Sequence, residues 1–206
     1  MITPENLMSM DKEQFSGTAN VLSGSDLSNL VDLLAERDDK VRYRAFLLLQ
    51  YRSMLFDDVY PFWEPFRSKL KSKNSCQLSI GIMLIAENAR WDVENKMEAS
   101  LDECMELLKD EKNTTIRQSI QALGKIAEAK PELSDKIADK LMSMDLSEIK
   151  GTMRKSVLLD VLTVLAAIRK RRNNGEIDSF IFNSLYSHSG GILDAKAVRQ
   201  IQALLL

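Results

Sequence analysis

The side chains that most often carry catalysis or bind metals are scarce in this sequence. It contains one histidine, His188, and two cysteines, Cys76 and Cys104. Because a zinc site takes three or four ligands, these residues could form one only with several carboxylates. Each cysteine lies in a helical pattern where a small apolar residue would serve, so both are expected to be buried or half-buried free thiols. The sequence therefore predicts no metal site, no disulfide and no cofactor.

Motifs of catalytic and nucleotide-binding sites are also missing from the sequence. It has no glycine-rich phosphate loop, no Ser-His-Asp set and no dinucleotide fingerprint. The single histidine lies in a loop-like stretch, so general acid–base catalysis would rest on carboxylates alone. We therefore expect that the chain is not an enzyme.

A short segment recurs five times, with an aliphatic or similar small residue followed by a long polar one at the start of an amphipathic helix. The long polar residues are Arg42, Gln77, Arg117, Arg154 and Arg199. The steps between them are 35, 40, 37 and 45 residues. Helix-pair repeats of about this length are typical of α-solenoids. The spacing predicts an all-α chain that folds as a right-handed α-α superhelix of about five helix pairs.

Apolar residues at spacings of three and four indicate where the helices lie. First helices of the pairs are expected at about 26–37, 57–70, 93–109, 131–144 and 176–186, and second helices at about 40–53, 74–88, 113–129, 148–171 and 194–205. Ser25 is a candidate N-cap, and Pro61 and Pro65 predict a helix that is kinked or starts late. Residues 1–24 are expected to form a lead-in or capping helix, and residues 25–206 a single repeat domain.

The paired helices, their spacing and the aliphatic-Arg opening of the second helices resemble HEAT repeats over about residues 25–206. The whole chain is also similar to small stand-alone HEAT-like proteins of low-GC Gram-positive bacteria. The resemblance implies that second helices line a concave surface. It also implies a structural ladder, in which an arginine ties one repeat to an acidic residue or helix end in its neighbour. The ladder residues would be Arg42, Arg117, Arg154 and Arg199, and Gln77 departs from the pattern.

Charge is divided unevenly between the two helices of each pair. The second-helix segments 40–53, 74–90, 112–128, 148–172 and 194–206 together carry +12, and the first-helix segments 25–39, 57–73, 91–111, 131–147 and 173–193 carry −13. One interpretation is a basic concave face that attracts an acidic protein segment or another polyanion. The candidate residues of that face are Tyr43, Arg44, Gln118, Lys125, Lys155 and Gln200. The other interpretation is that the two layers pair with each other and contribute little individually.

Aromatic residues offer two further candidates for a site. The dense cluster from Tyr60 to Phe66 could be an exposed anchor for a partner or a core around a proline-kinked helix. Trp91 could be exposed or packed between repeats. With Asp92 beside it, Trp91 is also a superficial match to HEAT-like DNA-alkylation-repair glycosylases, which have a basic concave face with a tryptophan and a carboxylate.

Together these features predict a cytoplasmic, monomeric protein-interaction module that binds another protein, preferably an acidic segment, along its second helices. No apolar stretch approaches the roughly 20 residues of a membrane span, and the N-terminus lacks a secretory pattern. The alternative is nucleic-acid binding, with or without base repair. It requires Arg44, Lys125, Lys155 and Lys170 on one exposed stripe, whereas a protein-binding module should expose an apolar patch.

Overall fold

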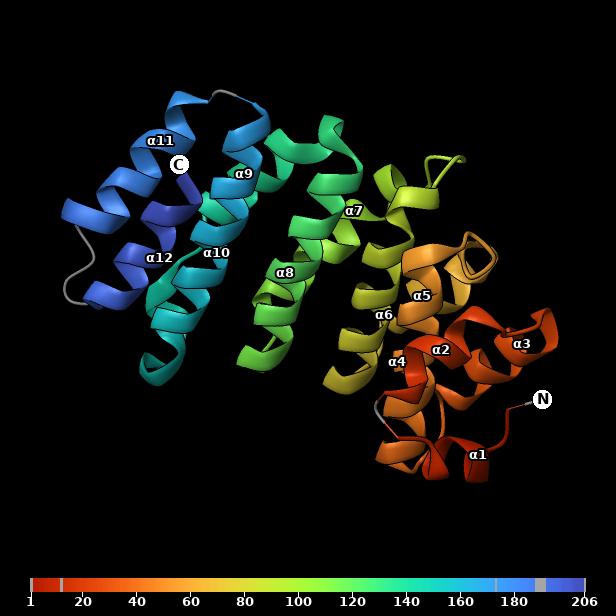
Figure 1. Ribbon diagram of the computed structural model, residues 1–206. Helices are drawn as coiled ribbons and strands as arrows, with labels where there is room; N and C mark the ends of the chain where they lie inside the picture. Colours follow the sequence, from red (N-terminus) through yellow and green to blue (C-terminus); the bar gives the residue numbers. More distant parts are fainter. Residues whose placement is uncertain (1, 12, 173, 188–191, 206) are drawn as a thin grey trace. The chain divides into compact units, whose positions relative to one another are not determined.

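The computed structural model describes residues 2–11, 13–172, 174–187 and 192–205, and these residues form helices joined by short turns, without strands (Figure 1). The all-α prediction is therefore confirmed. The chain divides into two compact units, Met1–Ser100 and Leu101–Leu206, called here the first and second units.

In the first unit, two helix pairs follow two short N-terminal helices. The helices are α1 (Pro4–Ser9), α2 (Gln14–Asn20), α3 (Gly24–Leu33), α4 (Asp39–Leu55), α5 (Trp63–Lys69) and α6 (Ser75–Asn88). The pairs are α3 with α4 and α5 with α6, and the two second helices, α4 and α6, pack on each other. Helix α7 (Lys96–Glu106) begins at the end of this unit and continues into the next. The expected second helices at 40–53 and 74–88 are confirmed.

In the second unit, the second helices again pack in chain order. The helices after α7 are α8 (Asn113–Ala129), α9 (Ser134–Met142), α10 (Gly151–Arg171), α11 (Gly175–Phe182) and α12 (Ala195–Leu205). A π-helical segment, Asn183–Ser187, extends α11. Helix α8 packs on α10, and α10 packs on α12. Because α10 is buried by neighbours on several sides, its apolar residues are not confined to one narrow stripe.

The two prolines near the start of α5 delay that helix, as expected. Residues Tyr60–Phe62 form a 3₁₀ turn and the α-helix begins only at Trp63. The aromatic cluster is core: Trp63 and Phe66 are fully buried, and the rings of Tyr60 and Trp63 lie 5.8 Å apart. The indole Nε1 of Trp63 also donates a hydrogen bond to Ser100 Oγ at 3.3 Å. Aromatic burial of this size makes a large contribution to the core.

Close approach of α5 to α6 depends on Gly81. A Cβ at this position would lie 2.8 Å from the carbonyl oxygen of Phe66 and 2.9 Å from Cβ of Lys69. Any larger residue would push the two helices apart, because one of these contacts is with backbone. Gly81 therefore sets the spacing of this helix pair.

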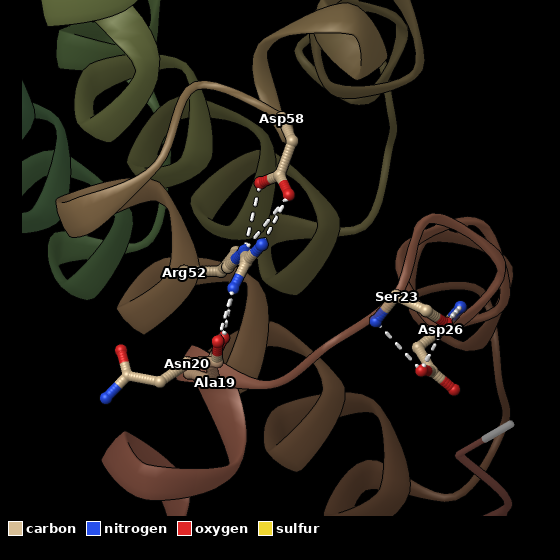
Figure 2. A network of polar contacts seen from close by, with 6 residues as sticks. All are labelled: Ala19, Asn20, Ser23, Asp26, Arg52 and Asp58. Carbon is tan, nitrogen blue, oxygen red and sulfur yellow. Dashed lines mark hydrogen bonds and ion pairs between the residues drawn. The ribbon is translucent and has the colours of Figure 1, made fainter.

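The described residues before α3 cover one side of α4. Helices α1 and α2 pack on α4 and bury Leu7, Phe15 and Ala19. The N-cap of α3 is Ser23 rather than the expected Ser25: the Ser23 hydroxyl accepts from the Asp26 backbone N–H, and the Asp26 carboxylate accepts from the Ser23 N–H (Figure 2). This capping box satisfies both backbone donors. Ser23 caps the helix because it has an acidic residue, Asp26, three positions later, whereas Ser25 has Ser28 at that position.

Asp26 also anchors the start of the chain, and this anchor is expected to depend on pH. Its carboxylate accepts from the Ser23 hydroxyl at 2.6 Å and from the Ser23 and Ile2 backbone N–H groups. The two hydrogen bonds from Ser23, led by that from its side chain, lower the pKa of Asp26 to about 2. Because the pKa is depressed in the folded chain, the stabilisation is present above the unfolded pKa of about 4 and is lost as the pH falls toward about 2.

The measurement is an NMR titration of the Ile2 amide. Its chemical shift is expected to change with a midpoint near the pKa of about 2. The variant Asp26→Asn, which cannot titrate, should remove that midpoint. A midpoint near the ordinary value of about 4 would contradict the prediction.

The cysteines differ in their burial. Cys104 is buried as expected, but Cys76 is exposed, so the expectation of a buried or half-buried thiol is wrong for Cys76. Cys76 lies in the first turn of α6, where its side chain leaves the apolar stripe that begins at Leu78. The first turn of a helix contains too few residues for their spacing to show which side of the helix is buried.

Candidate binding surface of the second helices

The recurring arginines begin the second helices, and most of them bond to nearby groups rather than to solvent. The guanidinium of Arg42 donates to the carbonyl oxygen of Glu36 at 2.7 Å and forms an ion pair with Asp39. That of Arg154 donates to the carbonyl oxygens of Ile149 and Ser147, at 2.9 and 2.8 Å. Both residues thus hold the turn that precedes their own helix.

Two members of the series connect different helix pairs. The guanidinium of Arg117 on α8 donates from Nε to Asp160 Oδ2 on α10 at 2.6 Å. Gln77, which replaces arginine in the second copy, donates from Nε2 to the carbonyl oxygen of Leu34 at the end of α3, at 2.8 Å. The glutamine thus makes the tie to a neighbouring helix end that the HEAT resemblance implies for arginine. Arg199 is exposed on α12, and its side chain makes no hydrogen bond or ion pair among the described residues.

Replacing Arg117 with alanine is expected to lower the free energy of unfolding by about 1 kcal/mol, because Asp160 would lose its charged partner while remaining half-buried. Any ligand affinity should stay within about threefold. Chemical unfolding and a binding titration of the same variant measure the two quantities. An unchanged stability with a large loss of affinity would instead make Arg117 a binding residue.

In the first unit, the candidate residues differ in what they can offer to a ligand. Tyr43 on α4 is 58% exposed. Arg44, its neighbour, is engaged: its guanidinium donates to the carbonyl oxygens of Leu7, Met8 and Met10, the last at 2.7 Å. Those carbonyls form the C-terminal end of α1, where a cation is favourable. Arg44 therefore holds α1 against α4, and Tyr43 is the more available of the two.

In the second unit, the remaining candidates come from three helices that pack in sequence. Gln118 and Lys125 lie on α8, the former half-buried and the latter exposed. Lys155 on α10 is exposed and forms an ion pair with Asp194, just before α12. Gln200 on α12 is exposed. The packing of α8 on α10 and of α10 on α12 brings these side chains into one unit.

Much of the basic charge of the second helices is paired with acidic groups in the same unit. Besides Arg42–Asp39, the ion pairs are Arg52–Asp58, Arg117–Asp160, Lys155–Asp194, Arg169–Asp178, Arg171–Glu128 and Arg172–Asp135. Most of these side chains are partly exposed, so each pair contributes little to stability. Their main effect is to reduce the positive potential that the second helices would otherwise present.

The side chains of Trp91 and Asp92 make hydrogen bonds inside the first unit. Asp92 is 4% exposed and accepts from the Tyr60 hydroxyl and from the backbone N–H groups of Lys96 and Met97, each at 2.9 Å. Burial, followed by the hydrogen bond to Asp92, raises the pKa of Tyr60 to about 12. The indole of Trp91 donates to the carbonyl oxygen of Ser53 at 2.7 Å. Trp91 therefore packs between repeats, and Asp92 caps the start of α7.

The described residues give little support for a metal site or for a membrane-spanning helix. No three His, Cys, Asp or Glu side chains among them gather as metal ligands. His188 lies outside the described residues. None of the helices described combines the length and apolar character needed to cross a membrane.

Comparison with known proteins identifies the fold. No protein-family model and no curated protein matches the chain. Among solved structures, the designed armadillo repeat protein YIII(Dq)4CqI is 17% identical, with a TM-score of 0.60 over 98% of this chain and 96% of that one. Armadillo repeat proteins computationally designed for modular peptide recognition are 18% identical, with a TM-score of 0.58 over 98% and 96%. The designed protein YIII(Dq.V1)4CPAF, solved in complex with the peptide (KR)4, is 16% identical, with a TM-score of 0.57 over 98% of each chain.

The chain is an all-α solenoid, similar in fold to armadillo repeat proteins. The likeness covers nearly the whole chain, and at these identities it concerns the fold alone. A solenoid stacks helix pairs so that each contacts its neighbours.

Two buried polar residues of the solenoid's first unit were not among the sequence candidates. Arg52 is 8% exposed at the end of α4, and Glu87, 1% exposed on α6, accepts from Gln50 Nε2 at 2.9 Å. A signal existed for Arg52, because it continues the buried stripe of Ala45 and Leu48 at spacings of three and four. A charged residue in such a stripe indicates an internal ion pair.

Proposed function

We propose that the chain is a non-enzymatic interaction module that binds an extended segment of another protein along its second helices. The observation that carries this proposal is the presence of aromatic and amide side chains on these helices: Tyr43 and Gln200 are exposed and Gln118 is half-buried. An amide can donate to and accept from a peptide backbone, and tyrosine is enriched at protein interfaces. The fold likeness to designed proteins for modular peptide recognition supports the same class of function.

The preferred partner in this proposal is an acidic segment. The second-helix segments carry +12 in total, and Lys125, Lys155 and Lys170 are exposed on the second unit. Because many of the neighbouring cations are paired internally, we expect charge to contribute modestly and the salt dependence of binding to be shallow. The peptide in the complex of the armadillo protein is basic, and the positive charge of the second-helix segments of this chain argues for the opposite preference. The proposal places this activity in the cytoplasm.

The alternative, nucleic-acid binding, is less well supported by the side-chain contacts. Arg44 bonds to three carbonyl oxygens and Lys155 to a carboxylate, so at least two of the four cations that this alternative requires are already engaged. Trp91 and Asp92 bond to groups of their own unit. A polyanion groove needs several cations directed at phosphates.

The test is fluorescence anisotropy with labelled twelve-residue peptides of acidic, neutral and basic composition, and with single- and double-stranded DNA of similar length. We expect the acidic peptide to bind at least about tenfold more tightly than the basic one. The double variant Gln118→Ala/Gln200→Ala should weaken its binding, whereas Arg199→Ala should have a smaller effect. Tighter binding of DNA with a steep loss at high salt would favour the nucleic-acid alternative instead.

A further inference from the structure

Large apolar side chains that remain exposed gather at the C-terminal end of α4. Of the ten such side chains among the described residues, four lie in the last turns of this helix and its cap: Tyr51 at 38%, Met54 at 45%, Leu55 at 58% and Phe56 at 37% exposed. A fifth, Val21 at 79%, follows α2. These five residues are called here the α4-end patch. The other five exposed large apolar side chains are Met8, Tyr43 near the start of α4, Val93, Phe182 and Tyr186.

Val21 joins the other four residues through Arg52. The guanidinium of Arg52 donates to the carbonyl oxygens of Ala19 and Asn20, at 2.9 and 3.0 Å, and so holds the end of α2 beside α4 (Figure 2). The same guanidinium carbon lies 3.7 Å from the ring centroid of Phe56. The patch thus draws on two segments that Arg52 holds together.

The backbone under the patch is fixed, so its exposure is not that of a frayed helix end. The carbonyl oxygen of Ser53 accepts from Trp91 Nε1 at 2.7 Å, and that of Met54 accepts from Arg90 at 3.3 Å. Arg52 also forms a two-pronged ion pair with Asp58, which follows the helix. A preorganised apolar surface loses little conformational freedom when it binds.

The size of the patch indicates a modest interface. With about 150–250 Å² for each large residue, the exposed fractions correspond to roughly 500 Å². A patch of this size on a monomer often marks an interaction site. A stable protein–protein interface buries about 800 Å² on each partner. The patch could therefore form the centre of a small and reversible interface.

The charges beside the patch make it complementary to itself. Arg90 is exposed next to the carbonyl of Met54, and Asp57 is exposed directly after Phe56. A two-fold axis that passes between Arg90 and Asp57 would place the cation of one copy against the anion of the other, twice. The neighbouring Asp58 pairs with Arg52, so its charge is neutralised within the same copy.

We infer that the α4-end patch is a reversible homodimer interface, in which apolar side chains of two copies pack together and Arg90 of each copy pairs with Asp57 of the other. This differs from the monomer expected from the sequence. The interface is separate from the proposed peptide-binding residues, of which only Tyr43 and Arg44 share α4.

Sedimentation equilibrium of the whole chain over a concentration range from micromolar to submillimolar tests this inference. The weight-average mass is expected to rise from 23.4 kDa toward twice that value. Leu55→Glu should weaken association by at least about tenfold, because it buries a charge at the centre of the patch. The matched control is Val93→Glu, at a valine that is 87% exposed outside the patch, and it should leave association unchanged.

A charge exchange tests the two-fold arrangement itself. Arg90→Glu and Asp57→Arg should each weaken association by several-fold, and the double variant should restore it. Melting curves of each variant show whether the fold is retained, and both residues are exposed. A monomeric mass at every concentration would overturn the inference. So would equal effects of Leu55→Glu and Val93→Glu, or a double variant that associates no better than the single ones.

Discussion

Replacing Arg52 with alanine is expected to lower the free energy of unfolding by about 1–3 kcal/mol. The side chain is nearly buried and makes two-pronged contacts with Asp58, with Nε–Oδ1 at 3.0 Å and Nη2–Oδ2 at 2.6 Å (Figure 2). It also supplies the donors for two carbonyl oxygens at the end of α2. Removal would leave a carboxylate and two carbonyl groups without this partner, which costs more than the pair itself contributes.

Urea unfolding followed by far-ultraviolet circular dichroism measures this loss. Arg52→Lys keeps the charge but not the planar fork, so it should recover only part of the stability. The matched control is Arg37→Ala, an exposed arginine of the same unit, which should change stability by no more than about 0.5 kcal/mol. A loss below about 1 kcal/mol for Arg52→Ala would show that water replaces the guanidinium without penalty.

Truncation of the fully buried leucines Leu48 and Leu123 is expected to cost about 2–5 kcal/mol each. Both are 0% exposed, Leu48 on α4 in the first unit and Leu123 on α8 in the second. An alanine at either site removes apolar contacts and leaves a cavity that helices packed on several sides cannot fill. Thermal and urea unfolding measure the change.

Val93→Ala is the control for both truncations, because its side chain is 87% exposed and little packing is lost. Its effect should lie within about 0.5 kcal/mol. If Leu48→Ala or Leu123→Ala changed stability as little as this control does, the assignment of the buried face of that helix would be wrong.

The helices were largely predictable from the sequence because each buries one stripe of apolar residues. The segments expected at 74–88 and 113–129 match α6 and α8 within one residue. The first turns of the helices were less predictable: Ser25 is not the N-cap of α3, and Cys76 in the first turn of α6 is exposed. At such positions the preference depends on a few side-chain hydrogen bonds and on one turn of helix, and both give a weak pattern.

The partners of the charged residues were not predictable to the same degree. Spacing placed Arg117 at the start of a second helix, but its contact, Asp160, lies 43 residues away and depends on how α8 packs on α10. Arg44 was expected near a groove, and its three carbonyl partners come from α1, in a lead-in whose glycines gave little helix signal. The α4-end patch was not predictable, because Tyr51 and Leu55 continue an apolar pattern that normally indicates burial.

Both tryptophans of the chain, Trp63 and Trp91, belong to the first unit. The native chain therefore carries a built-in optical reporter for one half of its structure, whereas circular dichroism reports on helices of both halves. In the Leu123→Ala variant, a tryptophan transition that moves with the dichroism transition would mean that the halves melt cooperatively. A tryptophan transition that keeps the midpoint of the unsubstituted chain would mean that the two halves of the solenoid unfold in separate steps. The intrinsic fluorescence would then follow these steps without an added label.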